Sequence, residues 1–384
     1  MITPLNLAWR QLVHGRLRLL VAITAVAFAV VLMLLQLGFR DALFGSSVRT
    51  HKRLNADLVL ISPQSSYLAL MKSFSRRRLY QALSIPGVED VASVYTGVPD
   101  WKNPLTGNAR AIFLIGFDPK EAAVDLPEVA ANLDRIAFPD RVLFDADSRP
   151  EFGPIARDFA KGKEVSAEVG GRRLTVVGLY RIGTSFGIDG SLITSDLNFL
   201  RVFARRNPGS IDIGLIRLKP GVNPEAAREA IARALPDDVE VLTKSGFIDR
   251  EIDYWARLTP IGYVFKLGTI LGFVIGGIIV YQILFNDVSH HLPGYATLKA
   301  IGYSGAYLSS VVVAEAVLLA LIGYLPGLAI SLEIYNVTAK ATLLPMHLGS
   351  DIALQVLALT VVMCCAAGLL AMRKVRSADP ADIF

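Results

Sequence analysis

Cysteine, histidine and metal-binding patterns are scarce in this chain. Of its 384 residues, two are cysteines and five are histidines. Cys364 and Cys365 are adjacent inside an apolar run, so they cannot build a disulfide framework, and we interpret them as small apolar side chains. The histidines lack the spacing of a zinc site. Metal chemistry therefore has no support in the sequence.

Motifs of nucleotide-binding and hydrolytic enzymes are also missing. Gly162 and Lys163 are followed by Glu164, and no Gly-x-x-x-x-Gly-Lys-Ser/Thr segment occurs, so we expect no P-loop. No Gly-x-Ser-x-Gly segment and no ordered acid/base set suggests a catalytic centre. We therefore predict a chain that is not an enzyme and that carries no cofactor of its own.

Charge is sparse outside one central segment. Hydrophobic residues make up 53% of the chain and charged residues 19%, and the mean hydropathy of +0.46 is high for a soluble protein of this size. Most charges lie between Arg40 and Ala256, a segment with the composition of a soluble domain. The excess of basic residues lies beside the apolar runs instead. No basic folded unit is available for nucleic acid, which we do not expect as a partner.

Four long apolar runs predict membrane-spanning helices, because about 20 helical residues cross the hydrocarbon core of a bilayer. The predicted spans are residues 19–39, 267–286, 304–332 and 352–372. A signal peptide is the competing interpretation of the first run. However, the apolar region of a signal peptide is shorter than this run, and no Ala-x-Ala cleavage site follows the run here. The predicted fold class is an α-helical membrane protein with four transmembrane helices and a large extracytoplasmic α+β domain inserted between helices 1 and 2.

Basic residues near both ends predict the orientation. Arg10, Arg16 and Arg18 precede the first span, and Arg373 and Lys374 follow the last. We therefore expect a protein of the bacterial inner membrane with both termini on the cytoplasmic side. The remaining predicted parts are a cytoplasmic amphipathic helix at 1–18, a periplasmic domain at 40–266, a cytoplasmic loop at 287–303, a short periplasmic loop at 333–351 and a cytoplasmic tail at 373–384.

The amino-terminal segment predicts a helix that lies at the membrane surface. Thr3 is the expected N-cap and Pro4 the first helical residue. One face is predicted to hold Leu5, Ala8, Trp9, Leu12 and Val13. A helix of this kind would contact membrane lipid, and a simple basic flank to the first span is the alternative.

The large central segment predicts mixed strands and helices in one or two small subdomains. A hairpin is expected at Gly170 and Gly171, and the segments that join the domain to the membrane are expected to form a helical stalk. The predicted strands are 58–61, 111–115, 165–169, 174–179 and 211–218, and the predicted helices are 75–83 and 224–235.

Small residues and one acid mark the later spans. We predict that the glycines at four-residue spacing are helix-packing surfaces, and a glycine-lined pore is the alternative. They are Gly268, Gly272 and Gly276 in the second span and Gly323 and Gly327 in the third. The intramembrane Glu315 should face protein, either in a hydrogen bond to a neighbouring helix or in a proton or substrate role.

The segment from His291 to Tyr303, HLPGYATLKAIGY, resembles the coupling segment of FtsX/MacB-type ABC transporter permeases. Residues 315–323 resemble the third span of that family and residues 377–382 its carboxy-terminal signature. The stretches 296–300 and 142–145 are most similar to the DevC-like exporter permeases of cyanobacteria. Gly294 departs from the family, which usually has an acidic residue there.

The resemblance implies a homodimeric permease subunit that works with a separate cytoplasmic ATPase, which would bind ATP and Mg²⁺. It also implies a periplasmic adaptor, an outer-membrane channel and export of a glycolipid or another hydrophobic substrate. An FtsX-like regulator of a cell-wall hydrolase and a lipoprotein-releasing permease are the alternatives. The residues expected to couple to the ATPase are Tyr295, Leu298, Lys299, Ile301 and Gly302, with Leu298 and Ile301 on one face of a short helix.

Overall fold

The computed structural model of the chain describes residues 3–344 and 346–376, with side chains described up to Arg373. The chain forms two compact units, Met1–Ala42 with Pro260–Phe384, and Leu43–Thr259. The first is called the membrane unit below and the second the outer unit. The carboxy-terminal signature at 377–382 lies outside the described residues.

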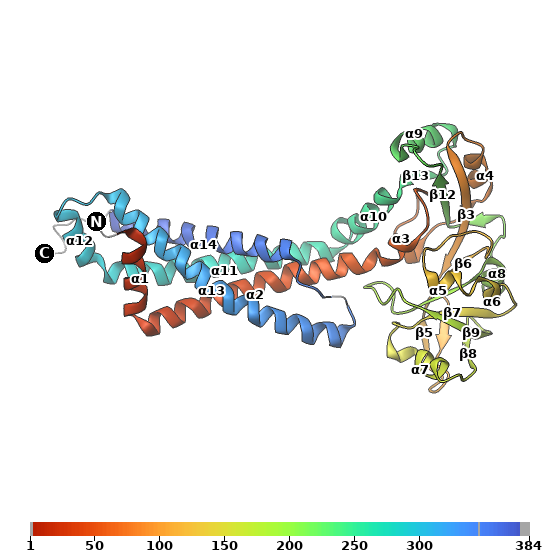
Figure 1. Cartoon of the computed structure of the whole chain (residues 1–384), viewed down its shortest axis with the longest axis horizontal. Coiled ribbons are helices and arrows are strands. Elements are labelled where there is room, and N and C mark those ends of the chain that lie inside the picture. Colours follow the sequence, from red (N-terminus) through yellow and green to blue (C-terminus); the bar gives the residue numbers. More distant parts are fainter. Residues whose placement is uncertain (1–2, 345, 377–384) are drawn as a thin grey trace. The chain divides into compact units, whose positions relative to one another are not determined.

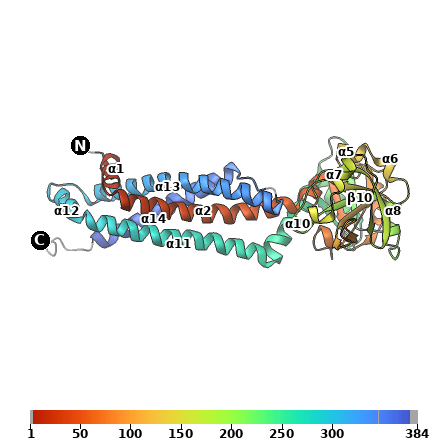
Figure 2. The ribbon, with the colours of Figure 1, turned by 90° about the horizontal axis from the view of Figure 1, so that it is seen from below.

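The membrane unit contains four long apolar helices, α2 (Arg16–Ser47), α11 (Pro260–His290), α13 (Gly305–Thr342) and α14 (Ser350–Arg376). Among the described residues, these are the helices long and apolar enough to cross a membrane. Each extends beyond the uncharged run that predicted it, because a flanking charged residue ends the apolar run without ending the helix. The four helices lie side by side (Figures 1 and 2).

A buried apolar seam holds these helices together. It includes Val30 of α2, Leu284 of α11, Ala320 of α13 and Cys364 of α14, which are at most 1% exposed. Cys364 thus packs as a small apolar side chain.

The amino-terminal helix α1 (Pro4–His14) packs against α13. Its predicted apolar face is divided: Ala8 and Leu12 are buried, whereas Trp9 is 49% exposed, together with Leu5 and Val13. Thr3 occupies the N-cap position, but its side chain makes no capping hydrogen bond. An interfacial position of α1 stays a prediction, which its exposed apolar residues support and its N-cap does not.

The outer unit is built on one mixed sheet rather than on two subdomains. Its described strands follow the spatial order β13-β1-β12-β3-β6-β10-β7-β9-β8-β4-β5. These strands are β1 (Leu58–Ile61), β3 (Val88–Gly97), β4 (Asp100–Lys102), β5 (Ala109–Ala111), β6 (Phe113–Phe117), β7 (Arg141–Asp145), β8 (Val165–Val169), β9 (Arg172–Tyr180), β10 (Ser191–Ser195), β12 (Ile213–Leu218) and β13 (Glu240–Thr243). A separate pair joins β2 (Phe74–Ser75) and β11 (Ser210–Ile211).

Both faces of the sheet are buried. In β1, Leu58 and Leu60 belong to one apolar cluster, and Val59 and Ile61 belong to the other. Helices cover the two faces, so successive side chains of β1 are buried on alternate sides, and its sequence is a continuous apolar run. The helices of this unit are α3 (Arg49–Arg53), α4 (Arg77–Leu83), α5 (Pro127–Ala130), α6 (Leu133–Ile136), α7 (Ile155–Ala160), α8 (Asp196–Val202), α9 (Pro224–Ala234) and α10 (Lys244–Asp253).

The predicted strand at 211–218 is interrupted at Asp212. The Asp212 carboxylate is buried and accepts hydrogen bonds from Thr96 N (2.7 Å) and Ser73 Oγ (3.1 Å). Residues before Asp212 therefore pair in β11 and residues after it pair in β12. The predicted strand at 111–115 is similarly displaced, because Ala111 ends β5 and β6 begins at Phe113.

Several local predictions are confirmed. Strands β1 and β8 have the predicted bounds, and β8 pairs with β9 across positive-φ residues Gly170 and Gly171. Helix α9 begins after Asn223, whose side chain accepts from Glu225 N (2.9 Å) and Ala226 N (3.2 Å).

The two ends of the outer unit meet at a buried polar contact. α3 packs against α10, where His51 Nε2 lies 3.4 Å from Glu251 Oε2. Glu251 Oε1 also accepts from Trp255 Nε1 (2.9 Å), at the start of a π-helical turn, Tyr254–Leu258. Both segments that lead toward the membrane helices are thus helical and are held to each other.

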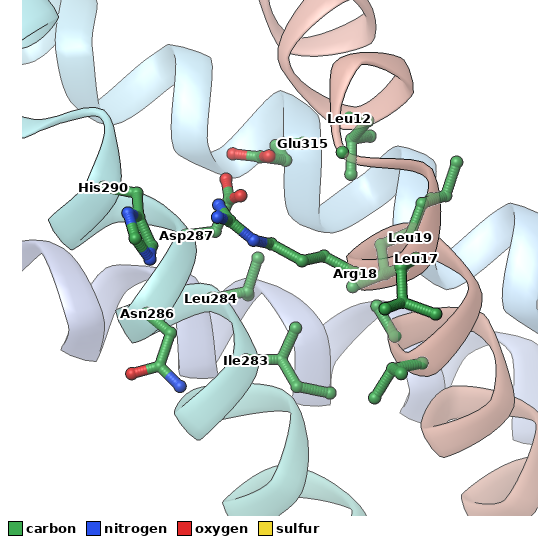
Figure 3. A pocket seen from close by; sticks show the side chains of 14 residues that line it. Leu12, Leu17, Arg18, Leu19, Ile283, Leu284, Asn286, Asp287, His290 and Glu315 are labelled. Carbon is green, nitrogen blue, oxygen red and sulfur yellow. The ribbon is translucent and has the colours of Figure 1, made fainter.

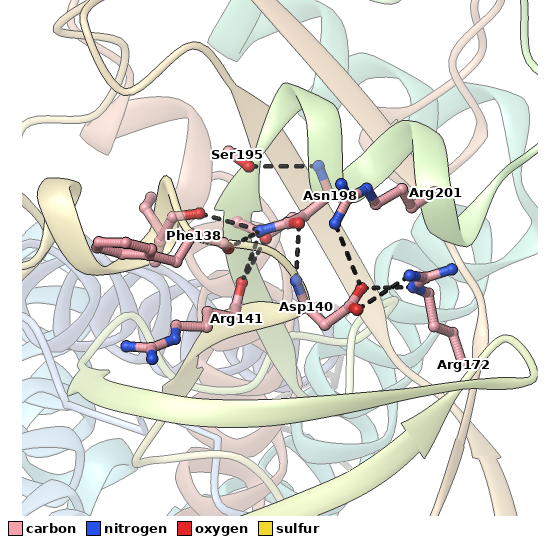
Figure 4. Close-up of polar contacts among 9 residues, drawn as sticks. Phe138, Asp140, Arg141, Arg172, Ser195, Asn198 and Arg201 are labelled. Atoms are coloured by element: carbon pink, nitrogen blue, oxygen red, sulfur yellow. Dashed lines mark hydrogen bonds and ion pairs between the residues drawn. The ribbon is translucent and has the colours of Figure 1, made fainter.

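A polar hub holds the loop before β7. The Asn198 side chain donates to the carbonyl oxygens of Ile136 (3.0 Å), Phe138 (2.9 Å) and Arg141 (3.3 Å) (Figure 4). Its Oδ1 accepts from Asp140 N (2.9 Å). Asp140 has φ of +60°, a conformation that a non-glycine residue adopts only where its surroundings hold it there.

Candidate functional site

The connection between α11 and α13 is built around one short helix, α12 (Leu292–Ala300). A tight turn ends this helix: Gly302 N donates to Lys299 O (3.1 Å) and Tyr303 N to Leu298 O (3.0 Å). Gly302 has φ of +106°, which side-chain-bearing residues rarely adopt. This pair of hydrogen bonds is the Schellman arrangement, and it explains why glycine stands at position 302.

The inner face of α12 is docked onto the membrane unit. Tyr295 is 3% exposed and Leu298 is half-buried. They pack in a small apolar cluster with Val288, Leu308, Val312 and Met372. The Tyr295 hydroxyl also donates to Gln11 Oε1 of α1 at 3.3 Å. The helix is therefore held by contacts to α1, α11, α13 and α14.

The face of α12 that points away from the membrane unit is exposed, and so is the turn that ends the helix. Lys299 and Gly302 are exposed, and Ile301 is 71% exposed. Leu298 and Ile301, which were predicted to share one face, have different surroundings: Leu298 enters the apolar cluster, whereas Ile301 follows the last helical residue and is exposed. Among the five predicted coupling residues, Lys299, Ile301 and Gly302 are thus open to a partner, and Tyr295 and Leu298 hold the helix in place.

The glycine stripes lie at close helix contacts within the chain. A Cβ added to Gly323 or Gly327 of α13 would lie 2.6 Å and 2.8 Å from the Cβ atoms of Val26 and Val30 of α2. Those glycines therefore let α13 approach α2 more closely than any larger residue would.

On α11 an added Cβ at Gly276 would lie 2.5 Å from Ala29 Cβ, and one at Gly268 would lie 2.5 Å from Gln36 Cδ. Gly272 has a looser neighbour, Leu32 Cβ at 3.3 Å. The three glycines thus face α2, and the contact at Gly272 is the loosest.

Glu315 is fully buried in α13. The Asp287 carboxyl of α11 lies near it in the same cavity (Figure 3). Among the residues that the structure describes, no donor hydrogen-bonds to either Glu315 oxygen. The contact to the neighbouring helix is therefore a hydrogen bond only when one of the two carboxyl groups carries a proton.

In the sequence, Arg18 belongs to the basic flank that predicts the orientation, and Asp287 follows the second predicted span. In the structure both line one cavity with Glu315 (Figure 3). Arg18 lies near the amino terminus of α2 and Asp287 near the carboxy terminus of α11. The available signal was that two consecutive spans of opposite direction bring these ends to the same side of the bilayer. In the described part of the chain, no group of three or more His, Cys, Asp or Glu side chains is arranged to hold a metal ion.

Two family models match the chain. Residues 19–234 match the MacB-like periplasmic core domain, and residues 267–380 match the FtsX-like permease C-terminal domain. The chain belongs to the FtsX/MacB-like ABC transporter permeases. The first match includes α2 and most of the outer unit, and the second includes α12 with the three later membrane helices. The predicted family is therefore confirmed.

Solved structures similar to this permease cover about half of it. The periplasmic region of MacB from Actinobacillus actinomycetemcomitans is 9% identical, with a TM-score of 0.35, over 50% of this chain and 91% of that one. The extracellular domain of the noncanonic ABC-type transporter YknZ from Gram-positive bacteria is 12% identical, with a TM-score of 0.32, over 48% and 99%. A domain of a Porphyromonas gingivalis permease protein is 14% identical, with a TM-score of 0.31, over 50% and 89%. No curated protein matches the permease.

Proposed function

We propose that this permease transmits conformational change between a separate cytoplasmic ATPase, bound at α12, and the outer unit in the periplasm. The observation that carries the proposal is the division of α12 into a docked face and an exposed face. Tyr295 and Leu298 fix the helix to the membrane unit, so a force applied at Lys299 and Ile301 would reach α11 and α13 instead of moving a loose loop.

In the proposed topology, the large unit is inserted between the first and second membrane helices and lies in the periplasm. Both termini and α12 lie in the cytoplasm, as the basic residues at the chain ends favour. The ATP and Mg²⁺ of the reaction would be bound by the partner ATPase. Gly294 is exposed and has no neighbouring atom within 4 Å of an added Cβ, so its departure from the family pattern alters the surface offered to that partner.

We further propose that the permease acts as a homodimer in an exporter with a periplasmic adaptor and an outer-membrane channel, and that its substrate is a glycolipid or another hydrophobic molecule. α11 is the least buried of the four membrane helices within the chain, which leaves room for a second protein neighbour. The DevC-like assignment belongs to the same proposal. An FtsX-like regulator or a lipoprotein-releasing permease would share the ATPase and differ in the outer partners.

The docking experiment compares two exposed apolar residues. Ile301→Asp places a charge in the proposed ATPase contact, whereas Leu105→Asp changes a residue of the outer unit that is 73% exposed, close to the 71% of Ile301. We expect Ile301→Asp to reduce co-purification of the ATPase at least tenfold, since one desolvated charge at an interface costs several kcal/mol. Leu105→Asp should not change it. Normal ATPase binding by Ile301→Asp would contradict the proposed docking site.

A further inference from the structure

The membrane unit contains a cavity of about 530 Å³ between the α1–α2 connection, α11 and α13. Its volume lies within the roughly 300 to 1,000 Å³ of small-molecule pockets. Polar and apolar side chains both line it: Arg18, Asp287, His290 and Glu315 contribute charge or hydrogen-bonding groups, and Leu12 and Leu319 are among the apolar residues (Figure 3). The cavity is thus suited to an amphiphile.

The polar part of the cavity contains carboxyl oxygens without a hydrogen-bond partner. Glu315 is 0% exposed, and both of its oxygens lack a hydrogen-bond partner among the described residues. Asp287 Oδ2 is likewise without a hydrogen bond in the described structure, although His291 Nδ1 lies 3.5 Å from it. Unpaired buried carboxyl groups are costly, so a ligand that supplies N–H donors and positive charge would be favoured.

Arg18 adds a group of the opposite sign. Its side chain extends from α2 into the cavity that Asp287 and Glu315 also line (Figure 3). A ligand that carried only a cation would leave Arg18 facing that cation. A ligand with a cation next to an anion can satisfy the carboxyl groups and the guanidinium together.

The surroundings of the cavity are those of a lipid-facing surface. Leu17 and Val21, which line the cavity, are 78% and 52% exposed, and Leu20 beside them is 61% exposed. Apolar side chains are thus offered to a hydrocarbon chain next to the charged groups. A membrane lipid can reach such a cavity from the bilayer without passing through water.

We propose that this cavity binds an ammonium-bearing phospholipid of the phosphatidylethanolamine class as a resident lipid. The primary ammonium donates hydrogen bonds to Glu315 and Asp287, and the phosphate pairs with Arg18. The first part of an acyl chain lies along Leu12 and Leu319. Phosphatidylcholine fits less well because its quaternary ammonium has no N–H donor, and phosphatidylglycerol fits less well because it has no cation.

The test titrates the detergent-purified, full-length permease with each of these three lipids and records its unfolding temperature. Phosphatidylethanolamine should stabilise at a half-saturating concentration about tenfold or more below the other two. Glu315→Gln should remove that preference, whereas Glu333→Gln, an exposed change in the same helix, should retain it. Equal stabilisation by the three lipids, or an unchanged preference in Glu315→Gln, would overturn the proposal.

A second variant keeps the test decisive if Glu315→Gln does not fold. Arg18→Gln should weaken phosphatidylethanolamine about tenfold but leave the binding of oleylamine, which has an ammonium and no phosphate, nearly unchanged. Native mass spectrometry can count the lipids retained by each protein. Loss of both probes in Arg18→Gln, or of neither, would contradict the proposed contacts. Retention of anionic lipid alone by the wild type would also contradict them, because the two carboxyl groups would then lack an ammonium partner.

Discussion

Asn198 is the residue on which the loop from Ile136 to Arg141 depends. Asn198→Ala would remove the acceptor of Asp140 N and the donors to three carbonyl oxygens. Leaving such buried groups unpaired costs about 1–3 kcal/mol each in the least favourable case, and we expect a total loss of roughly 2–4 kcal/mol after local relaxation. The unfolding temperature of the outer unit within the intact permease is the measurement. Asn108→Ala, at an exposed site, is the control and should be neutral.

Asp140 should give part of the permease's stability a pH dependence. Its hydrogen bond to Arg172 (Nη2 to Oδ2, 2.9 Å), with Arg201 nearby, lowers the pKa of the Asp140 carboxyl below its ordinary value. The stabilisation is therefore present above the unfolded pKa of about 3.9 and is lost as pH falls through the lower folded pKa.

We expect Asp140→Asn to lower the unfolding temperature at pH 7, and the difference from the wild type to shrink below about pH 4. Asparagine tolerates the positive φ of this position, so the change tests charge and not backbone strain. Asp134→Asn, an exposed neighbour, is the control. A difference that is constant from pH 7 to pH 3 would show that the ion pair is not its source.

Sequence patterns were informative about single residues only where a local rule decides the outcome. The need for glycine at position 302 follows from the positive φ of the turn that ends α12. The packing of Cys364 as a small apolar side chain follows from the apolar run around it. The orientation of Leu298 could not be predicted, because it depends on Met372 and Leu308, which come from other helices. The cavity that joins Arg18 to Glu315 depends in the same way on residues far apart in the sequence.

At the scale of elements, two adjacent glycines of α11 give a matched test of helix packing. A Cβ on Gly276 would lie 2.5 Å from Ala29 Cβ and 2.9 Å from Met363 Sδ, whereas on Gly277 its nearest neighbour is Met363 Cγ at 3.5 Å. Gly276→Ala should therefore lower stability by about 1–3 kcal/mol through overpacking. Gly277→Ala should be neutral or slightly stabilising, since alanine is the better helix former. Thermal unfolding in detergent measures both. Equal effects would contradict the close contact between α2 and α11.

Elements were predictable where composition alone sets them. The four membrane helices follow from long apolar runs with little charge, and β1 and β8 follow from short apolar runs bounded by turn residues. β3 was not predicted, because Glu89, Asp90 and Ser93 interrupt its apolar pattern. Its pairing with β12 and β6 forms only when distant parts of the chain meet, and no local signal reports that.

At the scale of the whole molecule, the proposed orientation can be measured with a membrane-impermeant maleimide. In a Cys364→Ala, Cys365→Ala background, Leu105→Cys should react in cells whose outer membrane alone is permeable, because the outer unit is expected in the periplasm. Ile301→Cys should react only after the inner membrane is opened. Both positions are highly exposed, so side-chain burial would not explain a difference. The reverse pattern of labelling would invert the topology.

The central claim is that ATP hydrolysis on a partner subunit changes the arrangement of the outer units through α12. The most direct test places a spin label at the exposed position Lys161 of the cysteine-free permease, reconstituted in nanodiscs with its ATPase. Distances between the labels of the two protomers are measured without nucleotide and with ATP and vanadate. We predict that the distance distribution shifts in the wild type and stays fixed in Ile301→Asp. An unchanged distribution in a wild-type complex that hydrolyses ATP normally would contradict the account.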